Sequence, residues 1–308
     1  MTIRSLDLLD LPILARYRND VLTLDSTRAL TRGHPLGAMG LLAYINPARH
    51  LYAAVHNGEG SSDASLLGGI IHTRGETFAK LLYLAPSFKL SDPNLPALIE
   101  HLAAQAGEWQ AFHVIAEVEE TSEVFATLRK AGFSVYAWQR VWDVSHIQKT
   151  EASLNVGWKR VQSVHLPAVQ RLHYQIVPQL LHPVDPAPNR PNGFIYTDGH
   201  CYASVNYGMY GVVLTPLMLP DEGKVDDKIA SLVSSLPDRR GRSVYLTVRS
   251  YQAWLESALE DLGAKASPRQ AVMVKYLARL VKEGVPARVS PANARIQPTQ
   301  MSRMDADE

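Results

Sequence analysis

The chain has 308 residues, of which 46% are hydrophobic and 20% charged, and its formal net charge is +1. This composition is that of a globular protein and excludes a globally disordered chain, and the length favours about two domains. The near-zero net charge argues against nucleic acid or an anionic membrane as an electrostatic partner.

The sequence also restricts the compartment and the metal chemistry. Cys201 is the single cysteine, so no intrachain disulfide can form, and it is better explained as a small apolar strand residue than as a nucleophile. The first seven residues lack a basic stretch followed by an apolar one, and no run of about 18 apolar residues occurs. His165, His173 and His182 lack the spacing of metal ligands. We expect a cytoplasmic protein without a membrane span or a bound metal.

In chain order, the first half predicts one strand and one helix, then three strands joined by short turns, then helix, strand, helix and strand. Asp10 and Pro12 open the first helix as N-cap and first-turn residues, and Gly132 ends the last one. The three consecutive strands read as an antiparallel meander. The expected strands span residues 2–8, 51–55, 66–73, 77–85, 112–118 and 133–144, and the expected helices span residues 10–21, 94–110 and 123–131, with a further helix around 38–44.

The second half repeats this order after a polar connection at residues 145–155. Its loop at residues 182–191 contains four prolines and cannot be regular structure. A polar tail without periodicity follows, and we expect it to be disordered. The expected strands span residues 158–164, 194–197, 201–207, 212–219, 243–248 and 271–277, and the expected helices begin at 165 and span 224–236 and 251–262.

A few identities support an internal repeat. Leu11-Pro12 recurs as Leu166-Pro167, and Leu128, Gly132 and Gln139 recur as Leu259, Gly263 and Gln270. The separation falls from 155 to 131 residues between these two sets, so the second copy is shorter. We therefore predict copy one at residues 1–148, copy two at 155–281 and the tail at 282–308.

This order of elements resembles the GNAT-type N-acetyltransferases. Residues 113–118 look like the family's fifth strand, and residues 128–133 look like the end of the helix that follows it. The resemblance implies an α/β fold of two tandem GNAT-like domains, each a mostly antiparallel meander continued by helix, strand, helix and strand. It also implies acyl transfer from acetyl-CoA or another acyl-CoA to an amine.

The cofactor would bind along the fourth strand and the loop after it, where the family has a glycine-rich phosphate loop at a helix N-terminus. In copy one this implies Leu84, Ala85 and Lys89 as cofactor-binding residues. The loop at residues 86–94 has no glycine, however, and Pro93 removes one N–H donor. In copy two, residues 220–227 contain one glycine and four carboxylates. These acids also suit a helix N-terminus for structural reasons alone, which is the preferred explanation.

The catalytic residues that the resemblance implies are incomplete. Leu128 and Leu259 stand where the family often has a tyrosine that protonates the departing thiolate. Glu117 and Glu119 lie on the expected fifth strand of copy one and are candidates for the general base, as is Tyr83 on the fourth strand.

Two histidines, His72 and His113, are further candidates near these carboxylates. The alternative for Glu117 and Glu119 is a solvated strand end. Copy two has Val248 and Ser250 at the matching positions, so we expect no base there.

Three functions remain open from the sequence. The first is an N-acyltransferase with copy one as the active half, acting on a small-molecule amine or on a protein N-terminus or lysine. The second is an inactive tandem module that binds a metabolite or a protein partner. The third is a structural dimerisation module, and a homo-oligomer is compatible with all three. An open pantetheine slot between the fourth and fifth strands would favour the first, because pairing there uses only the strand backbone.

Overall fold

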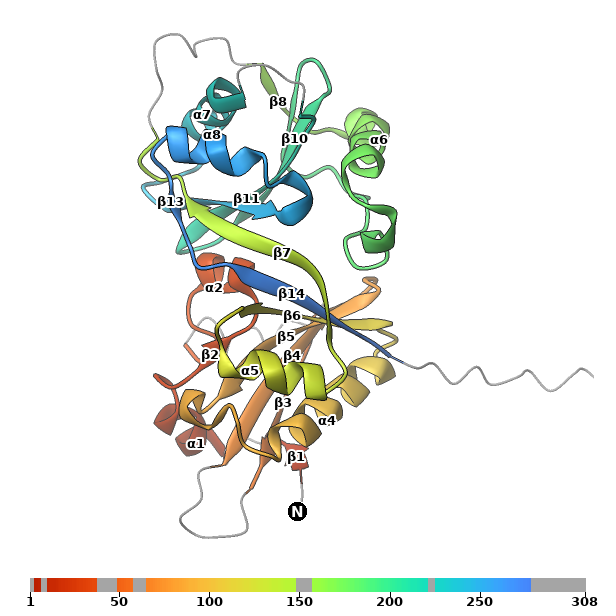
Figure 1. Cartoon of the computed structure of the whole chain (residues 1–308), viewed down its shortest axis with the longest axis vertical. Helices are drawn as coiled ribbons and strands as arrows, with labels where there is room; N and C mark the ends of the chain where they lie inside the picture. The colour runs from red at the N-terminus through yellow and green to blue at the C-terminus, as the bar shows by residue number, and fades with distance from the viewer. Residues whose placement is uncertain are drawn as a thin grey trace, which may run out of the picture. The chain divides into compact units, whose positions relative to one another are not determined.

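The structure is a computed structural model that describes residues 3–6, 10–37, 49–57, 65–147, 157–220 and 225–277. These residues form one compact unit, which the order of helices and strands divides into two similar halves (Figure 1). The helix expected at residues 38–44, most of the connection after residue 147 and the tail beyond residue 277 lie outside the described residues.

Copy one has the predicted order of elements, with two additions between its first helix and its meander. The additions are the short strand β2 (Leu22–Thr23) and the helix α2 (Ser26–Arg32). The other elements are β1 (Ile3–Ser5), α1 (Leu11–Arg16), β3 (Arg49–His56), β4 (Leu66–Thr73), β5 (Phe78–Ala85), η3 (Ser87–Lys89), α4 (Leu95–Glu108), β6 (His113–Glu119), α5 (Glu123–Lys130) and β7 (Ser134–Asp143).

Copy two repeats the order in a shorter form. Its elements are β8 (Trp158–Arg160), η5 (Ser163–His165), α6 (Leu166–Ile176), η6 (Gln179–Leu181), β9 (Phe194–Tyr196), β10 (Cys201–Tyr207), β11 (Gly211–Met218), α7 (Val225–Ser235), β12 (Ser243–Arg249), η7 (Ser250–Gln252), α8 (Leu255–Asp261), β13 (Lys265–Ala266) and β14 (Gln270–Tyr276). The prediction of a mixed α/β fold, with a meander continued by helix, strand, helix and strand in each half, is confirmed.

One mixed sheet runs through both copies because the copies exchange strands. Its order is β1-β3-β4-β5-β6-β14-β7-β12-β11-β10-β9-β8, so β14, the last strand that the structure describes, lies between the last two strands of copy one (Figure 1). β14 pairs antiparallel with both β6 and β7. In return, the second half of β7, from Gln139 to Asp143, pairs with β12 of copy two. Each sheet is therefore completed by a strand from the other copy.

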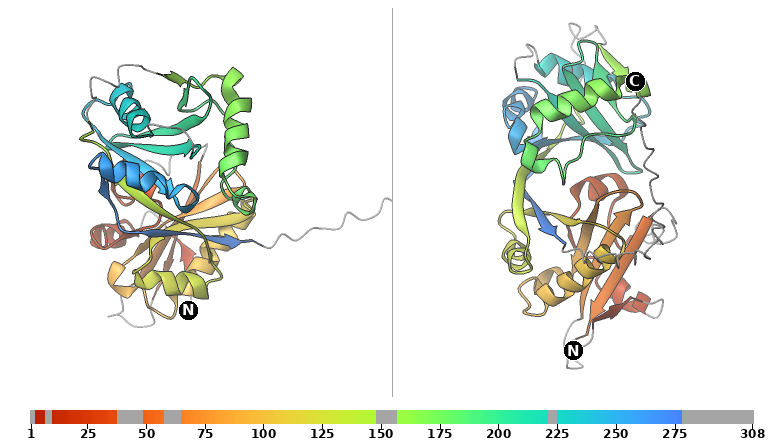
Figure 2. Two further views of the ribbon diagram at one scale, coloured as in Figure 1. Left: turned by 45° about the horizontal axis from the view of Figure 1, so that its top comes forward. Right: turned by 90° about the vertical axis from the view of Figure 1, so that its right-hand side faces the viewer.

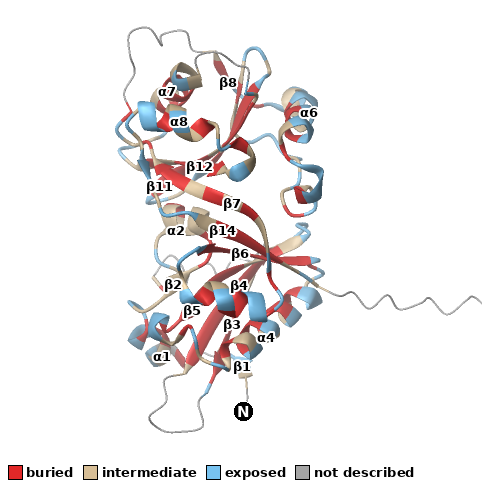
Figure 3. Ribbon diagram, in the orientation of Figure 1, coloured by how far each residue is buried: buried red, intermediate tan, exposed pale blue. Residues whose placement is uncertain are grey.

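Helices cover both faces of the sheet (Figure 2). In copy one, α4 and α5 pack Leu98 and Leu128 onto one face, and α1 packs Leu14 and Tyr17 onto the other. In copy two, α7 and α8 cover one face and α6 the opposite one, as their separate clusters show. The cluster beneath α6 also contains side chains of copy one and of β14, so the two copies share buried surface (Figure 3).

Some boundaries differ from the predictions for local reasons. The helix α2 was missed because residues 26–32 carry little apolar periodicity, yet Asp25 caps it by accepting a hydrogen bond from the Arg28 N–H at 3.1 Å. The first helix ends at Arg16 and not near Val21. In copy two, η5 shortens the expected strand at 158–164, and η7 delays the last helix until Leu255.

Tyr202, on β10 beneath α6, makes unfolding sensitive to alkaline pH. Its side chain is buried and its hydroxyl donates to the Asn192 carbonyl at 2.8 Å. Burial raises the pKa of Tyr202 to about 12. Because the pKa in the unfolded chain is about 10, the stabilisation is complete below that pH and about 3 kcal/mol is lost towards pH 12.

We expect this loss in urea unfolding measured across the alkaline range. Tyr202→Phe cannot ionise, so the free energy of unfolding of the unmodified chain should fall towards that of this variant as the pH rises. A difference between the two proteins that does not change with pH would contradict the assignment.

Candidate ligand-binding site

The strands β5 and β6 of copy one diverge after a short stretch of pairing. Only Phe78, Ala79 and Lys80 pair with residues of β6, in parallel register, although β5 continues to Ala85. A gap between these two strands is where the resemblance places the pantetheine slot. The backbone that would form that slot is therefore the part of β5 beyond Lys80 and the part of β6 beyond Ile115.

The chain itself occupies this gap in copy one. β2 pairs antiparallel with β5, so that Leu22 lies opposite Leu84 and Thr23 opposite Tyr83. The Leu24 N–H donates to the Leu82 carbonyl, and the Leu24 carbonyl accepts from the Glu117 N–H, both at 2.8 Å. Leu24 is 1% exposed and belongs to the core under α4. Backbone groups that a pantetheine arm would use thus already have partners within the chain.

In copy two, β11 and β12 diverge in the same way, and a different part of the chain fills the gap between them. β11 and β12 pair only from Gly211 to Leu214, although β11 continues to Met218. The side chain of Gln252, which is 1% exposed, fits beside the unpaired part. Its Oε1 accepts from the Met218 N–H at 2.9 Å, and its Nε2 donates to the Pro216 carbonyl at 2.8 Å. One amide therefore supplies the donor and the acceptor that a neighbouring strand would supply.

Several N–H groups of the loop after β5 already have partners in the chain. The Ser87 N–H donates to the Asp20 carbonyl at 2.8 Å, and the Asn94 N–H donates to Oδ1 of Asp92 at 2.8 Å. The N–H groups of Lys89, Asp92 and Leu95 also donate to carbonyls of this loop. A helix N-terminus binds phosphate through N–H groups that lack such partners. In copy two, residues 221–224 of the corresponding loop lie outside the described residues.

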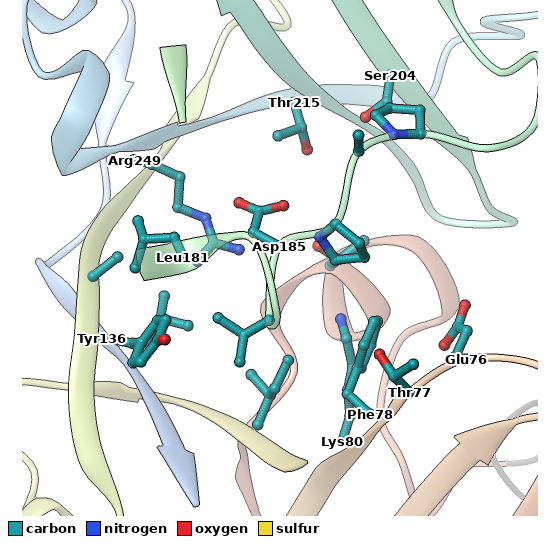
Figure 4. Close-up of a pocket in the computed structure, with 18 of the residues that line it drawn as sticks. Glu76, Thr77, Phe78, Lys80, Tyr136, Leu181, Asp185, Ser204, Thr215 and Arg249 are labelled. Atoms are coloured by element: carbon teal, nitrogen blue, oxygen red, sulfur yellow. The ribbon is translucent and has the colours of Figure 1, made fainter. Parts of the chain in front are cut away.

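A cavity of about 510 Å³ lies between the two copies (Figure 4). Copy one lines it from β5, β6 and the turn before β5, and copy two lines it from β10, β11, the end of β12 and the proline-rich loop at residues 184–188. Polar lining side chains from both copies are Thr27, Glu76, Thr77, Lys80, Glu117, Tyr136, Asp185, Asn189, Ser204, Asn206, Thr215, Arg249 and Tyr251. Polar side chains of both copies therefore converge on this cavity.

Five charged side chains line the cavity, the cations Lys80 and Arg249 and the carboxylates Glu76, Glu117 and Asp185. Burial lowers the pKa of Lys80, but Asp25 and Glu117 outweigh this and raise it above its usual value. Burial likewise lowers the pKa of Arg249, and Asp185 and Glu117 again raise it overall. Both side chains are therefore cationic at neutral pH. Figure 4 shows Arg249 and Asp185 pointing into the same space, and Lys80 entering it from copy one.

Two of the carboxylates, Glu117 and Asp185, are held in place by neighbours. Oε2 of Glu117 accepts a hydrogen bond from the Ser26 N–H at 2.8 Å. Oδ2 of Asp185 accepts one from the Tyr251 hydroxyl at 3.0 Å. Burial and the Asp185 carboxylate both raise the pKa of Tyr251, so this hydroxyl keeps its proton. The Lys80 ammonium lies 3.4 Å from Oδ1 of Asp25.

The candidate catalytic residues of the sequence analysis do not lie together. Glu117 is buried on β6 and lines the cavity. Glu119 is exposed at the end of the same strand and does not line it. Tyr83 is 1% exposed, packs against Gly69 and belongs to the cluster with Leu14 outside the cavity.

The other candidates also lie away from the cavity. Leu84 and Ala85 are buried, and the backbone of Leu84 pairs with β2. Lys89 ends the short helix η3 and is partly exposed. His72 is buried against Trp109 and contacts the Glu76 carbonyl through Nε2 at 2.9 Å, and His113 is buried against the ring of Tyr276.

Sequence reasoning missed Lys80, Asp185 and Arg249. Lys80 interrupts an apolar strand, and Arg249 ends one. A charged residue in an apolar strand is rarely buried without a partner, so both positions indicate a polar site. Asp185 lies in a proline-rich loop that shows no pattern at all. None of these signals indicates that the three side chains meet, because they are contributed by three separate elements of both copies.

Among residues 3–277, as far as they are described, no group of three histidine, cysteine or acidic side chains is arranged to hold a metal ion. Within the same described residues, every helix is too short or too polar to cross a membrane.

Comparison with known proteins assigns the fold. No model of a protein family matches the sequence, and no curated protein matches it. The structure is similar to a GCN5-related N-acetyltransferase from Sphaerobacter thermophilus, with 14% identity and a TM-score of 0.51 over 89% of this chain and 95% of the other. It is also similar to a tandem GNAT protein from the clavulanic acid biosynthesis pathway, with 12% identity and a TM-score of 0.50 over 90% of this chain and 99% of the other. The chain therefore has the GNAT acyltransferase fold in two tandem copies, as its sequence predicted.

Proposed function

We propose that this protein is a tandem GNAT-fold module that binds a small polar molecule between its copies and has both acyl-CoA slots closed. The observation that carries the proposal is that each slot contains part of the chain. Residues 22–24 pair with β5 in copy one, and the amide of Gln252 takes the corresponding place in copy two. The cavity between the copies is by contrast open, and its size falls within the roughly 300–1,000 Å³ of small-molecule sites.

Isothermal titration calorimetry with two probes tests the closed slots. Acetyl-CoA carries both the pantetheine arm and the phosphates, whereas acetyl-pantetheine carries the arm alone. We expect neither probe to bind at high micromolar concentrations. Binding of acetyl-pantetheine at a stoichiometry near one would contradict the closed slots, and it would show that only the phosphate loop is altered.

A metabolite mixture followed by thermal unfolding tests the cavity. We expect some components to raise the melting temperature of the unmodified chain, because a ligand that binds only the folded state stabilises it. Ser204→Trp places an indole in the cavity from β10 and should abolish these shifts. Shifts that persist in this variant would mean that the ligand binds elsewhere.

Acyl transfer with copy one as the active half is a second candidate, which one observation favours. β5 and β6 still part beyond Lys80, and the Glu117 carboxylate lies in the adjoining cavity, where an amine from a small molecule or a protein would have to be deprotonated. This function requires residues 22–24 to leave the gap. It predicts acetyl-CoA turnover with an amine substrate that Glu117→Gln abolishes.

A further inference from the structure

Among the residues that the structure describes, the guanidinium of Arg249 has no hydrogen-bond or ion-pair partner, and the side chain lines the cavity. Its Nε is buried without a hydrogen bond, and none of the ion pairs between described residues involves Arg249. Arg249 is only partly exposed, and a cation with little access to water and no hydrogen bond from the protein is disfavoured. The planar fork of an arginine matches a carboxylate, which it binds through two parallel hydrogen bonds. The arrangement therefore calls for an anionic group on a ligand.

The nearest carboxylate of the chain does not fill this role. Asp185 raises the pKa of Arg249 by its charge, so it lies within electrostatic range. It is nevertheless outside ion-pair distance of Arg249, and its Oδ2 accepts from the Tyr251 hydroxyl instead. Asp185 thus keeps Arg249 charged and leaves its donors available to a ligand (Figure 4).

The copy-one side of the cavity has the opposite character. Lys80 is neutralised by Asp25, whose Oδ1 lies 3.4 Å away. Glu117 uses only Oε2 for the Ser26 N–H, and its Oε1 accepts no hydrogen bond from any residue that the structure describes. A carboxylate oxygen without a donor accepts an ammonium group well. This side of the cavity therefore calls for a cationic group.

The two requirements together exclude ligands that carry one sign of charge. A polyanion would meet Glu117 and Asp185, and a polyamine would meet Lys80 and Arg249. Like charges at close range, away from bulk water, repel each other. We propose that the cavity binds a small zwitterion, a free amino acid or a derivative that keeps both charges, with its carboxylate on Arg249 and its ammonium group on Glu117. This inference rests on the proposed function, because it names the ligand class of that same cavity.

Matched probes separate the two charges. Calorimetric titrations would use each L-amino acid, its amide, which lacks the carboxylate, and its N-acetyl derivative, which lacks the ammonium group. We expect at least one amino acid to bind, and its amide and its N-acetyl derivative to bind at least about tenfold more weakly, because each loses one charge-assisted interaction.

Two variants test the assignment of each charge to a residue. Arg249→Met should bind the amino acid and its amide equally, and Glu117→Gln, which keeps an acceptor for the Ser26 N–H, should bind the amino acid and its N-acetyl derivative equally. Arg140→Gln is the control, since Arg140 is a partly exposed arginine outside the cavity that pairs with Glu256 at 2.9 Å. It should keep the selectivity of the unmodified chain.

The outcomes distinguish this inference from the function on which it rests. An amide or N-acetyl derivative that binds the unmodified chain as well as the amino acid would overturn the zwitterion. The zwitterion would also be overturned if no amino acid binds while other metabolites produce thermal shifts that Ser204→Trp removes. In that case the cavity would still be a binding site. If no metabolite and no probe binds, both proposals are wrong.

Discussion

A fragment that ends at residue 148 is expected to be unfolded or insoluble, although it contains every element of copy one that precedes the linker. The sheet of copy one is completed by β14, from residues 270–276, which lies between β6 and β7. Without it, β6 loses one of its neighbours, and β7 loses the partner of its first half. An unpaired strand edge can pair with another chain, so these two exposed edges should make the fragment aggregate.

The size of the effect follows from what β14 buries. Val272, Met273 and Val274 are each at most 4% exposed. Burying side chains of this size stabilises a protein by about 2 kcal/mol each, so their loss alone removes about 6 kcal/mol. The whole stability of a domain is about 5–15 kcal/mol, so little would be left before the lost backbone pairing is counted.

Circular dichroism and gel filtration of the fragment measure this outcome. The matched control is the same fragment with residues 268–278 attached after residue 148 by a flexible linker, which restores the missing strand. We expect this control to be soluble and to unfold cooperatively. A fragment 1–148 that folds without the added strand would show that copy one can complete its own sheet.

Gln252→Ala is expected to lower the free energy of unfolding by about 2–6 kcal/mol, because each of two buried groups loses its hydrogen-bond partner at a cost of about 1–3 kcal/mol. Two groups are affected, the Met218 N–H and the Pro216 carbonyl, and both lie beside a side chain that is 1% exposed. Urea unfolding of the full chain measures the change.

Gln105→Ala is the matched control for Gln252→Ala. Gln105 lies on the solvent side of α4 and bonds only to Glu108 on the same helix, so its removal should change stability by less than about 0.5 kcal/mol. If Gln252→Ala were equally mild, water would be replacing the lost amide, and the slot of copy two would be open to solvent.

The sequence predicted local structure well where the chain carries its own signals. The strand at 66–73 has the predicted bounds, and the helix with Leu98 and Leu102 on one face begins and ends within two residues of its predicted limits. Gly132, expected to end a helix, has a positive φ of 84°, and Gly263, its counterpart in the repeat, has a positive φ of 74°. Apolar periodicity and helix-ending glycines are properties of neighbouring residues, so they are readable without the fold.

The candidate site was predictable only in small part. Glu117 was chosen because the resemblance places a base on the fifth strand, and it lines the cavity, but the cavity itself lies between the copies and was not foreseen. Leu22 and Thr23 give no sequence signal that they pair with β5, because pairing across about 60 residues depends on where the chain returns. Gln252 is likewise ordinary in sequence.

The sequence by itself thus determined the order of helices and strands, the repeat and the family resemblance, all of which depend on local patterns or on matched residues. Only the tertiary structure decided which strands pair, what occupies the two slots and which charges meet. Those outcomes depend on backbone hydrogen bonds that are the same for every residue type, and on side chains such as Lys80 and Arg249 brought together from different copies. A local sequence pattern does not indicate which strands pair or which distant side chains meet, so the site could be identified only from the tertiary structure.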